Sequence, residues 1–341
     1  MTTPPIHMCG QTIPAGSHTT VSLPVPDTSL GQGLSMPVHV YHGRRPGPAF
    51  FVSAAIHGDE LNGIEIVRRL TGLRRLSRLR GTLYAIPIVN IYGFMSNTRY
   101  LPDRRDLNRV FPGKAGGSLA SELALILFEH VVSRCRYGID LHTGSNHRAN
   151  FPHLRGDMKD ETIFAMAQAF GAPLVLDSCG VSGSLRQAAE QVGVKTLLYE
   201  AGEALRFDEF SIRAGLRGIT SLMSHLGMLP VVRKKQAPIS LQVAYDRTWC
   251  RAPESGLFHA KVKLGQRVKK DELLGTVHDP LGNRSCELLS PRNGVVIGQL
   301  ALPSVYKGDA IMHIACFKAP GRAEALADEF SELVMDQENP I

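Results

Sequence analysis

The spacing of hydrophobic and polar residues in the first two thirds of the chain predicts strands and helices in alternation. Short apolar runs typical of buried strands occur at Ala49–Ile56, Thr82–Val89, Tyr137–Leu141, Leu174–Leu176 and Lys195–Tyr199. Apolar residues at helical spacing predict helices over Leu61–Leu70, Ser118–Val132 (with Ser118 as its cap), Glu161–Phe170, Leu185–Val192 and Asp208–Leu226. Alternating strands and helices indicate an α/β fold whose largely parallel or mixed sheet is covered by helices on both faces.

The pattern changes after Pro230. Residues 231–236 are expected to form a linker, and the chain from there to Phe317 contains short strand-like runs with Gly and Pro turns. Two segments of this region resemble each other and suggest a small pseudo-symmetric barrel, namely Pro253–Asp271 and Pro291–Asp309. The pattern resembles the biotinyl/lipoyl carrier fold. However, the hairpin Val277–Asn283 lacks the lysine that carriers modify, so a carrier role is not expected.

These patterns divide the chain into three expected parts. Residues 1–230 form the main α/β domain, which carries the candidate catalytic residues, and residues 231–320 form the barrel-like domain. Residues 321–341 are predicted to be an exposed helix with a frayed end. The barrel-like domain is expected either to shape the mouth of the active site or to form an interface of a homo-oligomer.

Composition and charge narrow the class of protein. A content of 43% hydrophobic and 20% charged residues is ordinary for a globular protein and excludes a mainly disordered chain. The net charge is +7, and the densest basic cluster spans residues 68–80. Leucines interleave there at helical spacing and aromatic residues are absent, which favours an exposed helix face and a loop over a nucleic-acid-binding patch. We therefore expect no nucleic-acid partner.

The sequence also bears on location. Its first residues show neither the charges nor the apolar run of a signal peptide, and no stretch approaches the roughly 20 apolar residues that cross a bilayer. The six cysteines are scattered and form no Cys-x-x-Cys motif, which favours reduced thiols over disulfides or a zinc knuckle. A cytoplasmic protein without a membrane partner is expected.

The first candidate site element is His57-x-x-Glu60, which follows a predicted strand. An imidazole and a carboxylate at this spacing can hold one cation, although a strand-end histidine beside a capping acid is the more common explanation for such a pair alone. Gly58 and Asp59 fit a tight strand-to-helix corner, which needs a small residue and a cap. Ligands in α/β folds bind beyond the carboxyl ends of strands, where His57, His142 and Glu200 are all predicted to lie.

The second element is Asp140-Leu-His142. Residues two apart in a strand share a side, so Asp140 can accept a hydrogen bond from the outer nitrogen of a metal-bound His142. Two histidines and one glutamate with an open fourth position are the ligands of hydrolytic zinc sites, where the metal acidifies a water molecule and polarises a carbonyl.

Two further elements suggest substrate binding and proton transfer. Asn108-Arg109, on a predicted tight loop, offers amide donors and a guanidinium suited to a carboxylate, although a solvent-facing turn explains the pair equally well. Glu200 stands where an apolar strand stops. Burial and a nearby metal would act on it together, which suits a proton shuttle.

The order of these motifs resembles the succinylglutamate desuccinylase/aspartoacylase family, relatives of the zinc carboxypeptidases. The motifs are His-x-x-Glu, Arg-Tyr followed by Asp-Leu-Asn-Arg, Asp-Leu-His-Thr-Gly and a late Glu-x-Gly, and the resemblance covers about residues 45–230. It implies a carboxypeptidase-like α/β fold, one zinc ion per chain and removal of an acyl group from an acylated amino acid. The barrel-like C-terminal region is also similar to that of deacylases of this family.

Carried over by position, the resemblance implies a role for each motif residue. It makes His57, Glu60 and His142 the zinc ligands, Glu200 the catalytic acid and base, and Asn108 and Arg109 the pair that holds the substrate carboxylate. Arg99 matches the arginine that polarises the scissile carbonyl. This chain has two more residues than expected between Arg99 and the Asp-Leu-Asn-Arg motif, and Arg104 and Arg105 fill the gap. Whether Arg99 or Arg105 reaches the carbonyl stays open.

The sequence therefore predicts a zinc-dependent hydrolase that cleaves the amide bond of a small-molecule N-acyl amino acid. A metallocarboxypeptidase-like enzyme acting on a peptide or an amino-acid conjugate would have the same site and is the nearer alternative. A non-catalytic metal- or ligand-binding protein of this fold is less favoured, because every chemical role has a residue of the right type. A serine hydrolase is disfavoured by the lack of a Gly-x-Ser-x-Gly motif.

Overall fold

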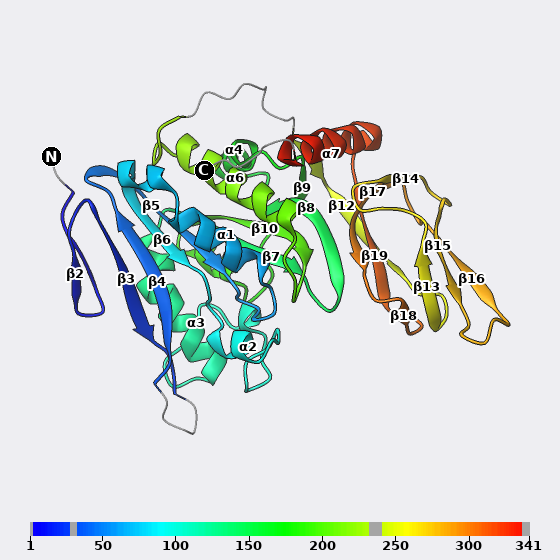
Figure 1. Cartoon of the computed structure of the whole chain (residues 1–341), viewed down its shortest axis with the longest axis horizontal. Coiled ribbons are helices and arrows are strands. Elements are labelled where there is room, and N and C mark those ends of the chain that lie inside the picture. The colour runs from blue at the N-terminus through cyan, green and yellow to red at the C-terminus, as the bar shows by residue number, and fades with distance from the viewer. Residues whose placement is uncertain (1–2, 28–32, 232–240, 336–341) are drawn as a thin grey trace.

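The computed structural model of the protein describes residues 3–27, 33–231 and 241–335. A large mixed sheet runs through the molecule (Figure 1). Its strands are β3 (Ser17–Pro24), β4 (Ser35–His42), β5 (Arg45–Ala54), β6 (Arg80–Ile86), β7 (Tyr137–Gly144), β8 (Arg148–Gly156), β9 (Leu174–Asp177), β10 (Lys195–Glu203), β11 (Gln242–Ala244), β12 (Asp246–Arg251), β14 (Arg267–Val268), β17 (Gly294–Leu300) and β19 (Ala310–Cys316). Neighbours along the sheet follow the order β12-β19-β17-β8-β10-β7-β5-β6-β4-β3, with β9, β11 and β14 paired at its side.

Helices cover both faces of this sheet, as the sequence predicts. They are α1 (Asn62–Thr71), α2 (Ile91–Met95), α3 (Leu119–His130), α4 (Glu161–Phe170), α5 (Leu185–Gln191), α6 (Glu209–His225) and α7 (Pro320–Met335). Strand β5 shows why two layers form. Its residues Phe50 and Val52 join the apolar core that contains α1, α4 and α6, whereas Phe51 joins the core that contains α3 and α5. Successive side chains of a strand point to opposite faces, so an almost continuous apolar run is buried on both sides.

Most predicted elements of the main domain are confirmed, with shifted ends. Strands β7 and β10 continue three and four residues beyond the predicted ends, to Gly144 and Glu203. The predicted cap of α3 is also confirmed, because the Ser118 hydroxyl accepts a hydrogen bond from the Ser121 amide. Within the described residues, no helix is long and apolar enough to cross a membrane.

Strand β8 was not predicted. It follows β7 directly and pairs antiparallel with β10 and parallel with β9. Its sequence contains Pro152 and lacks a regular alternation of polar and apolar residues. Proline is unusual in the interior of a sheet because it cannot donate a ladder hydrogen bond, so local pattern argued against a strand here.

The region after residue 241 is joined to the main sheet rather than set apart as a closed barrel. Strand β11 pairs with β9, and β17 pairs with β8, so the large sheet continues into this region at one end of the molecule (Figure 1). A second, antiparallel sheet packs beside it over a separate apolar cluster, and its strands are β13 (Gly256–Ala260), β15 (Leu273–His278), β16 (Ser285–Leu289) and β18 (Ser304–Val305). A short hairpin, β1 (Ile6–Met8) with β2 (Gln11–Ile13), lies near the other end. The predicted linker falls outside the described residues except for Val231.

Helix α7 forms where a C-terminal helix was predicted, but the prediction that it is exposed is wrong. It packs against α6, β14 and β17 and buries Ala323, Ala327, Phe330 and Val334 in the same core as α6. The ring of Phe330 lies 6.0 Å from that of Phe210 in an edge-on contact. One face of the helix is apolar and packs in the same apolar cluster as α6, so α7 is part of the main core.

This packing predicts that Phe330→Ala destabilises the whole protein. Removing a fully buried phenylalanine side chain typically costs about 3–5 kcal/mol, through lost burial and the cavity left behind. The matched control is Met335→Ala on the same helix, because Met335 is 59% exposed. Chemical denaturation of both variants measures the difference. Equal small losses in the two variants would show that α7 contributes little to the stability of the fold.

Candidate active site

His57 and Glu60 lie on the turn that connects β5 to α1. The turn folds back tightly at Gly58, where an added Cβ would lie 1.9 Å from the carbonyl carbon of Gly93. A glycine is therefore required for the two backbone segments to approach, as the sequence suggested. The second part of that expectation is wrong, because Asp59 is not the helix cap. The N-cap position of α1 is Leu61, with no side-chain cap hydrogen bond.

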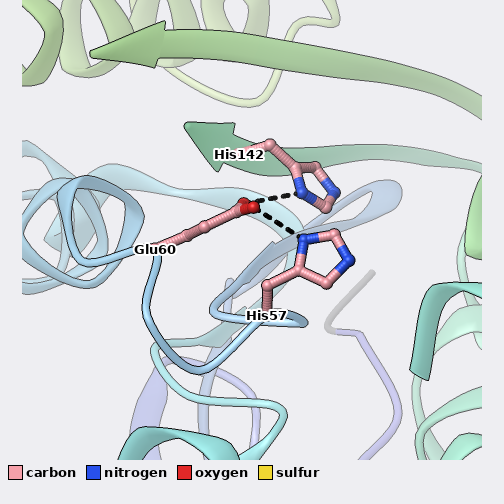
Figure 2. A group of neighbouring side chains, drawn as sticks. All are labelled: His57, Glu60 and His142. Carbon is pink, nitrogen blue, oxygen red and sulfur yellow. Dashed lines mark hydrogen bonds and ion pairs between the residues drawn. The ribbon is translucent and has the colours of Figure 1, made fainter. Parts of the chain in front are cut away.

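His142 reaches the same point from β7, which pairs in parallel with β5. Figure 2 shows the Glu60 carboxylate between the two imidazole rings. Glu60 Oε1 lies 2.7 Å from His57 Nδ1, and Glu60 Oε2 lies 2.8 Å from His142 Nδ1. One donor atom of each of the three residues lies within 4.8 Å of the others, and all three residues are buried.

The outer nitrogen of each histidine is held by a second carboxylate. His142 Nε2 lies 2.7 Å from Asp140 Oδ2, and Ser53 donates a hydrogen bond to the other Asp140 oxygen. The sequence predicts this partner of His142. It does not predict the equivalent partner of His57, whose Nε2 lies 3.1 Å from Asp106 Oδ1. Asp106 is the first residue of the Asp-Leu-Asn-Arg motif. A carboxylate in a motif already assigned to the site was therefore the one signal in the sequence that could have identified this partner of His57.

The electrostatics of the cluster follow from these pairs. Burial alone would lower the pKa of His57 and of His142, but the adjacent carboxylates outweigh it and raise both pKa values. Conversely, burial alone would raise the pKa of Glu60, yet the two imidazoles lower it. Two buried imidazoles and one buried carboxylate thus converge on one point.

The donor set fits a zinc ion. Two imidazole nitrogens and one carboxylate are a common set of protein ligands for catalytic zinc. The carboxylates on the two Nε2 atoms favour the tautomer that leaves Nδ1 unprotonated, and both Nδ1 atoms face Glu60. These contacts support His57, Glu60 and His142 as the group that could hold a metal.

The structure places Arg99 beside the cluster and Arg105 away from it. The Arg99 guanidinium donates to Asp106 Oδ2 at 2.8 Å and to the Ser145 hydroxyl at 3.0 Å, and it lies 3.5 Å from Glu60 Oε1. The Arg105 side chain is 54% exposed, pairs with Asp103 and is not part of the cavity wall. Of the two arginines left open by the sequence, Arg99 is the one near the cluster.

A cavity of about 250 Å³ opens over the cluster and contains the remaining candidate residues. Asn108 and Arg109 line it; the Asn108 side-chain oxygen accepts a hydrogen bond from the Leu185 amide, and Arg109 donates to the Asn108 carbonyl. The wall is rich in arginine, with Arg99, Arg109, Arg148, Arg155, Arg186 and Arg247 against two glutamates, Glu60 and Glu200. This excess of positive charge favours an anionic ligand.

Glu200 also lines the cavity, from β10. In the parallel register of β10 and β7 it stands directly opposite His142, which explains how residues 58 positions apart meet. The pairing of β10 with both neighbours shifts just after Glu200, and Gly202 adopts a φ of +75° that favours glycine. Glu200 and His142 lie inside their strands, close to the carboxyl ends, rather than after them.

The C-terminal region completes the cavity wall with Arg247 and Trp249 of β12. The Trp249 ring stacks on His313 at 4.3 Å, and the Arg148 guanidinium lies 5.4 Å from its centre. Of the two roles expected for this region, the presence of Arg247 and Trp249 in the cavity wall supports the first, shaping the mouth of the active site. The sequence did not identify these residues, because no local motif surrounds them.

Comparison with known proteins places this geometry in a family. Residues 46–226 match the family model described as the succinylglutamate desuccinylase/aspartoacylase catalytic domain. The chain is 26% identical over 313 residues to the N-alpha-acetyl-L-2,4-diaminobutyric acid deacetylase of Halomonas elongata, a match that covers 87% of this chain and 91% of that protein.

Solved structures are similar over nearly the whole chain. A succinylglutamate desuccinylase/aspartoacylase from Rhodobacter sphaeroides superimposes with a TM-score of 0.78 at 25% identity, covering 88% of this chain and 95% of the other. The product-bound ectoine utilization protein from Ruegeria pomeroyi shares the fold with a TM-score of 0.78 at 24% identity, covering 87% and 94%. Both alignments extend beyond the catalytic domain into the C-terminal region.

Proposed function

Because the chain belongs to the succinylglutamate desuccinylase/aspartoacylase family, we propose that it is a zinc-dependent hydrolase that cleaves the amide bond of an N-acyl amino acid. The observation that carries this proposal is the convergence of His57 Nδ1 and His142 Nδ1 on the Glu60 carboxylate, in the wall of a cavity that Glu200 also lines. The name of the Halomonas relative, a deacetylase of an acetylated amino acid, supports the reaction class.

The chain supplies a residue for each step of such a reaction. A zinc ion held by His57, Glu60 and His142 would lower the pKa of a water molecule and polarise the amide carbonyl. Glu200 would accept the proton from the attacking water and return it to the leaving amine. Arg99 would donate to the carbonyl oxygen as negative charge develops on it, since its guanidinium already lies beside the cluster.

Asn108 and Arg109 would anchor the carboxylate of the amino acid and so orient the amide over the metal. The six arginines of the wall support a small anionic substrate rather than a neutral one. In the basic cluster at residues 68–80, Arg68 and Arg69 both pair with Glu65, and Arg69 also pairs with Glu209. We also propose a cytoplasmic location, supported by six free cysteines.

Metal analysis of the purified protein, together with a product-release assay, tests the proposed function. The panel holds N-acetyl and N-succinyl amino acids, with N-alpha-acetyl-L-2,4-diaminobutyrate among them because of the relative, and N-capped dipeptides. The expected result is about one zinc per chain and release from at least one N-acyl amino acid. Release from the dipeptides alone would favour the carboxypeptidase-like alternative, and zinc binding without any turnover would favour a non-catalytic binding protein.

Arg109→Ala is expected to raise KM for a carboxylate substrate by about 10- to 100-fold, because hydrogen bonds to charged groups contribute about 1.5–3 kcal/mol. The same substitution should matter little for an analogue whose carboxylate is capped as an amide. Arg105→Ala is the matched control, since Arg105 lies outside the cavity. Steady-state kinetics on both substrates measures the effect. Equal losses on the two substrates would assign Arg109 a structural role.

A further inference from the structure

We propose that Asn150 is a positioning residue for the Glu200 carboxylate, and that Gly298 in the C-terminal region gives it the room to act. This inference rests on the proposed function, in which Glu200 transfers the proton. Neither residue belongs to the motifs that the sequence singled out. Asn150 lies on β8, the strand that was not predicted, and Gly298 lies on β17.

The first observation is that both oxygens of Glu200 are held from β8. Asn150 Nδ2 donates to Glu200 Oε2 at 2.9 Å, and Arg155 Nη2 lies 3.3 Å from Glu200 Oε1. The Glu200 side chain is 12% exposed and Asn150 is 8% exposed, so water competes little for these contacts. A glutamate side chain has three rotatable bonds, and contacts at both oxygens confine its carboxylate to one orientation.

The second observation is that Asn150 lies between two glycines in the sheet. It pairs with Gly202 of β10 on one side and with Gly298 of β17 on the other. Only the Gly298 side bears on the asparagine, because a Cβ added to Gly202 would instead meet Asn62, Asp208 and Ser211. An added Cβ on Gly298 would lie 3.0 Å from Asn150 Oδ1 and 3.1 Å from His313 Cβ.

His313 is itself backed by the stacked Trp249 ring, so little space exists on that side for adjustment. Strand β17 of the C-terminal region therefore bounds the space that Asn150 occupies, and Gly298 keeps that space open. This arrangement links the C-terminal region to the proposed chemistry through a packing contact, in addition to its share of the cavity wall.

The chemical consequence concerns orientation. Asn150 also lines the cavity, but an asparagine neither accepts nor releases a proton at neutral pH, so it cannot take over the proton transfer proposed for Glu200. Without it, Arg155 would be the remaining polar contact of Glu200 on β8, and the opposite charges would draw the carboxylate toward the guanidinium. A proton acceptor must lie within hydrogen-bond reach of its proton, so kcat should fall while substrate binding persists.

A double-mutant cycle tests the inference: Asn150→Ala is made in the parent and in Glu200→Gln, and kcat, KM and zinc content are measured. In the parent we expect kcat to fall about tenfold or more, in line with the loss of a hydrogen bond to a charged group. KM and zinc content should stay nearly constant. In the Glu200→Gln background, the same substitution should change kcat by less than about twofold, because residues that act as a unit are non-additive.

Gly298→Ala provides a second variant that removes no polar group. It should lower kcat in the parent, since the new methyl group displaces Asn150, but not in the Asn150→Ala background. A melting temperature close to that of the parent would separate this effect from unfolding.

Three outcomes would overturn the inference. The first is an unchanged kcat in Asn150→Ala, and the second is a loss that multiplies with that of Glu200→Gln. The third is a loss confined to KM, which would make Asn150 a substrate contact. Each of these leaves the proposed function intact if the parent is active and Glu200→Gln is impaired. A parent that is inactive on the whole panel would instead remove the proposed function, and this inference with it.

Discussion

Glu200→Gln should lower kcat by about 10²–10⁴-fold, the usual contribution of general acid–base catalysis, while zinc content and KM stay close to those of the parent. Glutamine preserves the shape of the side chain and can still receive the hydrogen bond from Asn150, but it cannot accept a proton at neutral pH. Glu200 is proposed to act twice, on the water and on the leaving amine, so the upper part of this range is expected. The substrate anchor at Arg109 is untouched, so binding should persist.

Glu203→Gln is the matched control for this substitution. Glu203 lies on the same strand and is buried to a similar degree, but it pairs with Arg206 and is not part of the cavity wall. Its kcat should stay within a few-fold of the parent. If Glu200→Gln instead keeps full zinc and a kcat near that of the parent, the proton shuttle lies elsewhere. Loss of zinc in Glu200→Gln would make Glu200 a ligand and would change the proposed ligand set.

His142→Ala should abolish both metal binding and activity. The substitution removes one of three ligands and leaves Glu60 and Asp140 as buried carboxylates without their shared imidazole. His57→Ala and Glu60→Ala are expected to behave alike. Elemental analysis of the purified variants measures zinc per chain, and circular dichroism shows whether they remain folded.

The control for metal content is His259→Ala, because His259 lies exposed on β13, outside the cluster. It should retain about one zinc per chain. Full zinc occupancy in folded His142→Ala would contradict the assignment of this site. Loss of zinc in both variants would mean that metal is bound elsewhere or that the substitutions act through stability.

The sequence by itself determined those parts of the protein that depend on near neighbours in the chain. Short, almost continuous apolar runs such as that of β5 identified a sheet buried on both faces, because successive residues of a strand point to opposite sides. The cap at Ser118 and the pairs His57–Glu60 and Asp140–His142 span three residues or fewer, so backbone geometry alone brings their side chains together. Motif order then sufficed to indicate the family.

Only the tertiary structure decided the contacts between distant residues. Asp106 meets His57 across 49 positions, and Asn150 meets Glu200 across 50, because strand order in the sheet determines which loops and strands become neighbours. Tertiary structure also distinguishes Arg99 from Arg105. The two arginines are equally plausible in the sequence, but only Arg99 lies beside the cluster.

Periodicity reports whether a residue is buried but not what it packs against. It therefore predicted helix α7 without the neighbours that bury Phe330, and it missed β8, whose Pro152 breaks the local pattern. The pairing of β17 with β8, which brings the C-terminal strands to the active site, has no local signature for the same reason. A hydrogen-bonded strand pair between residues about 150 positions apart is specified by the whole sheet rather than by either segment.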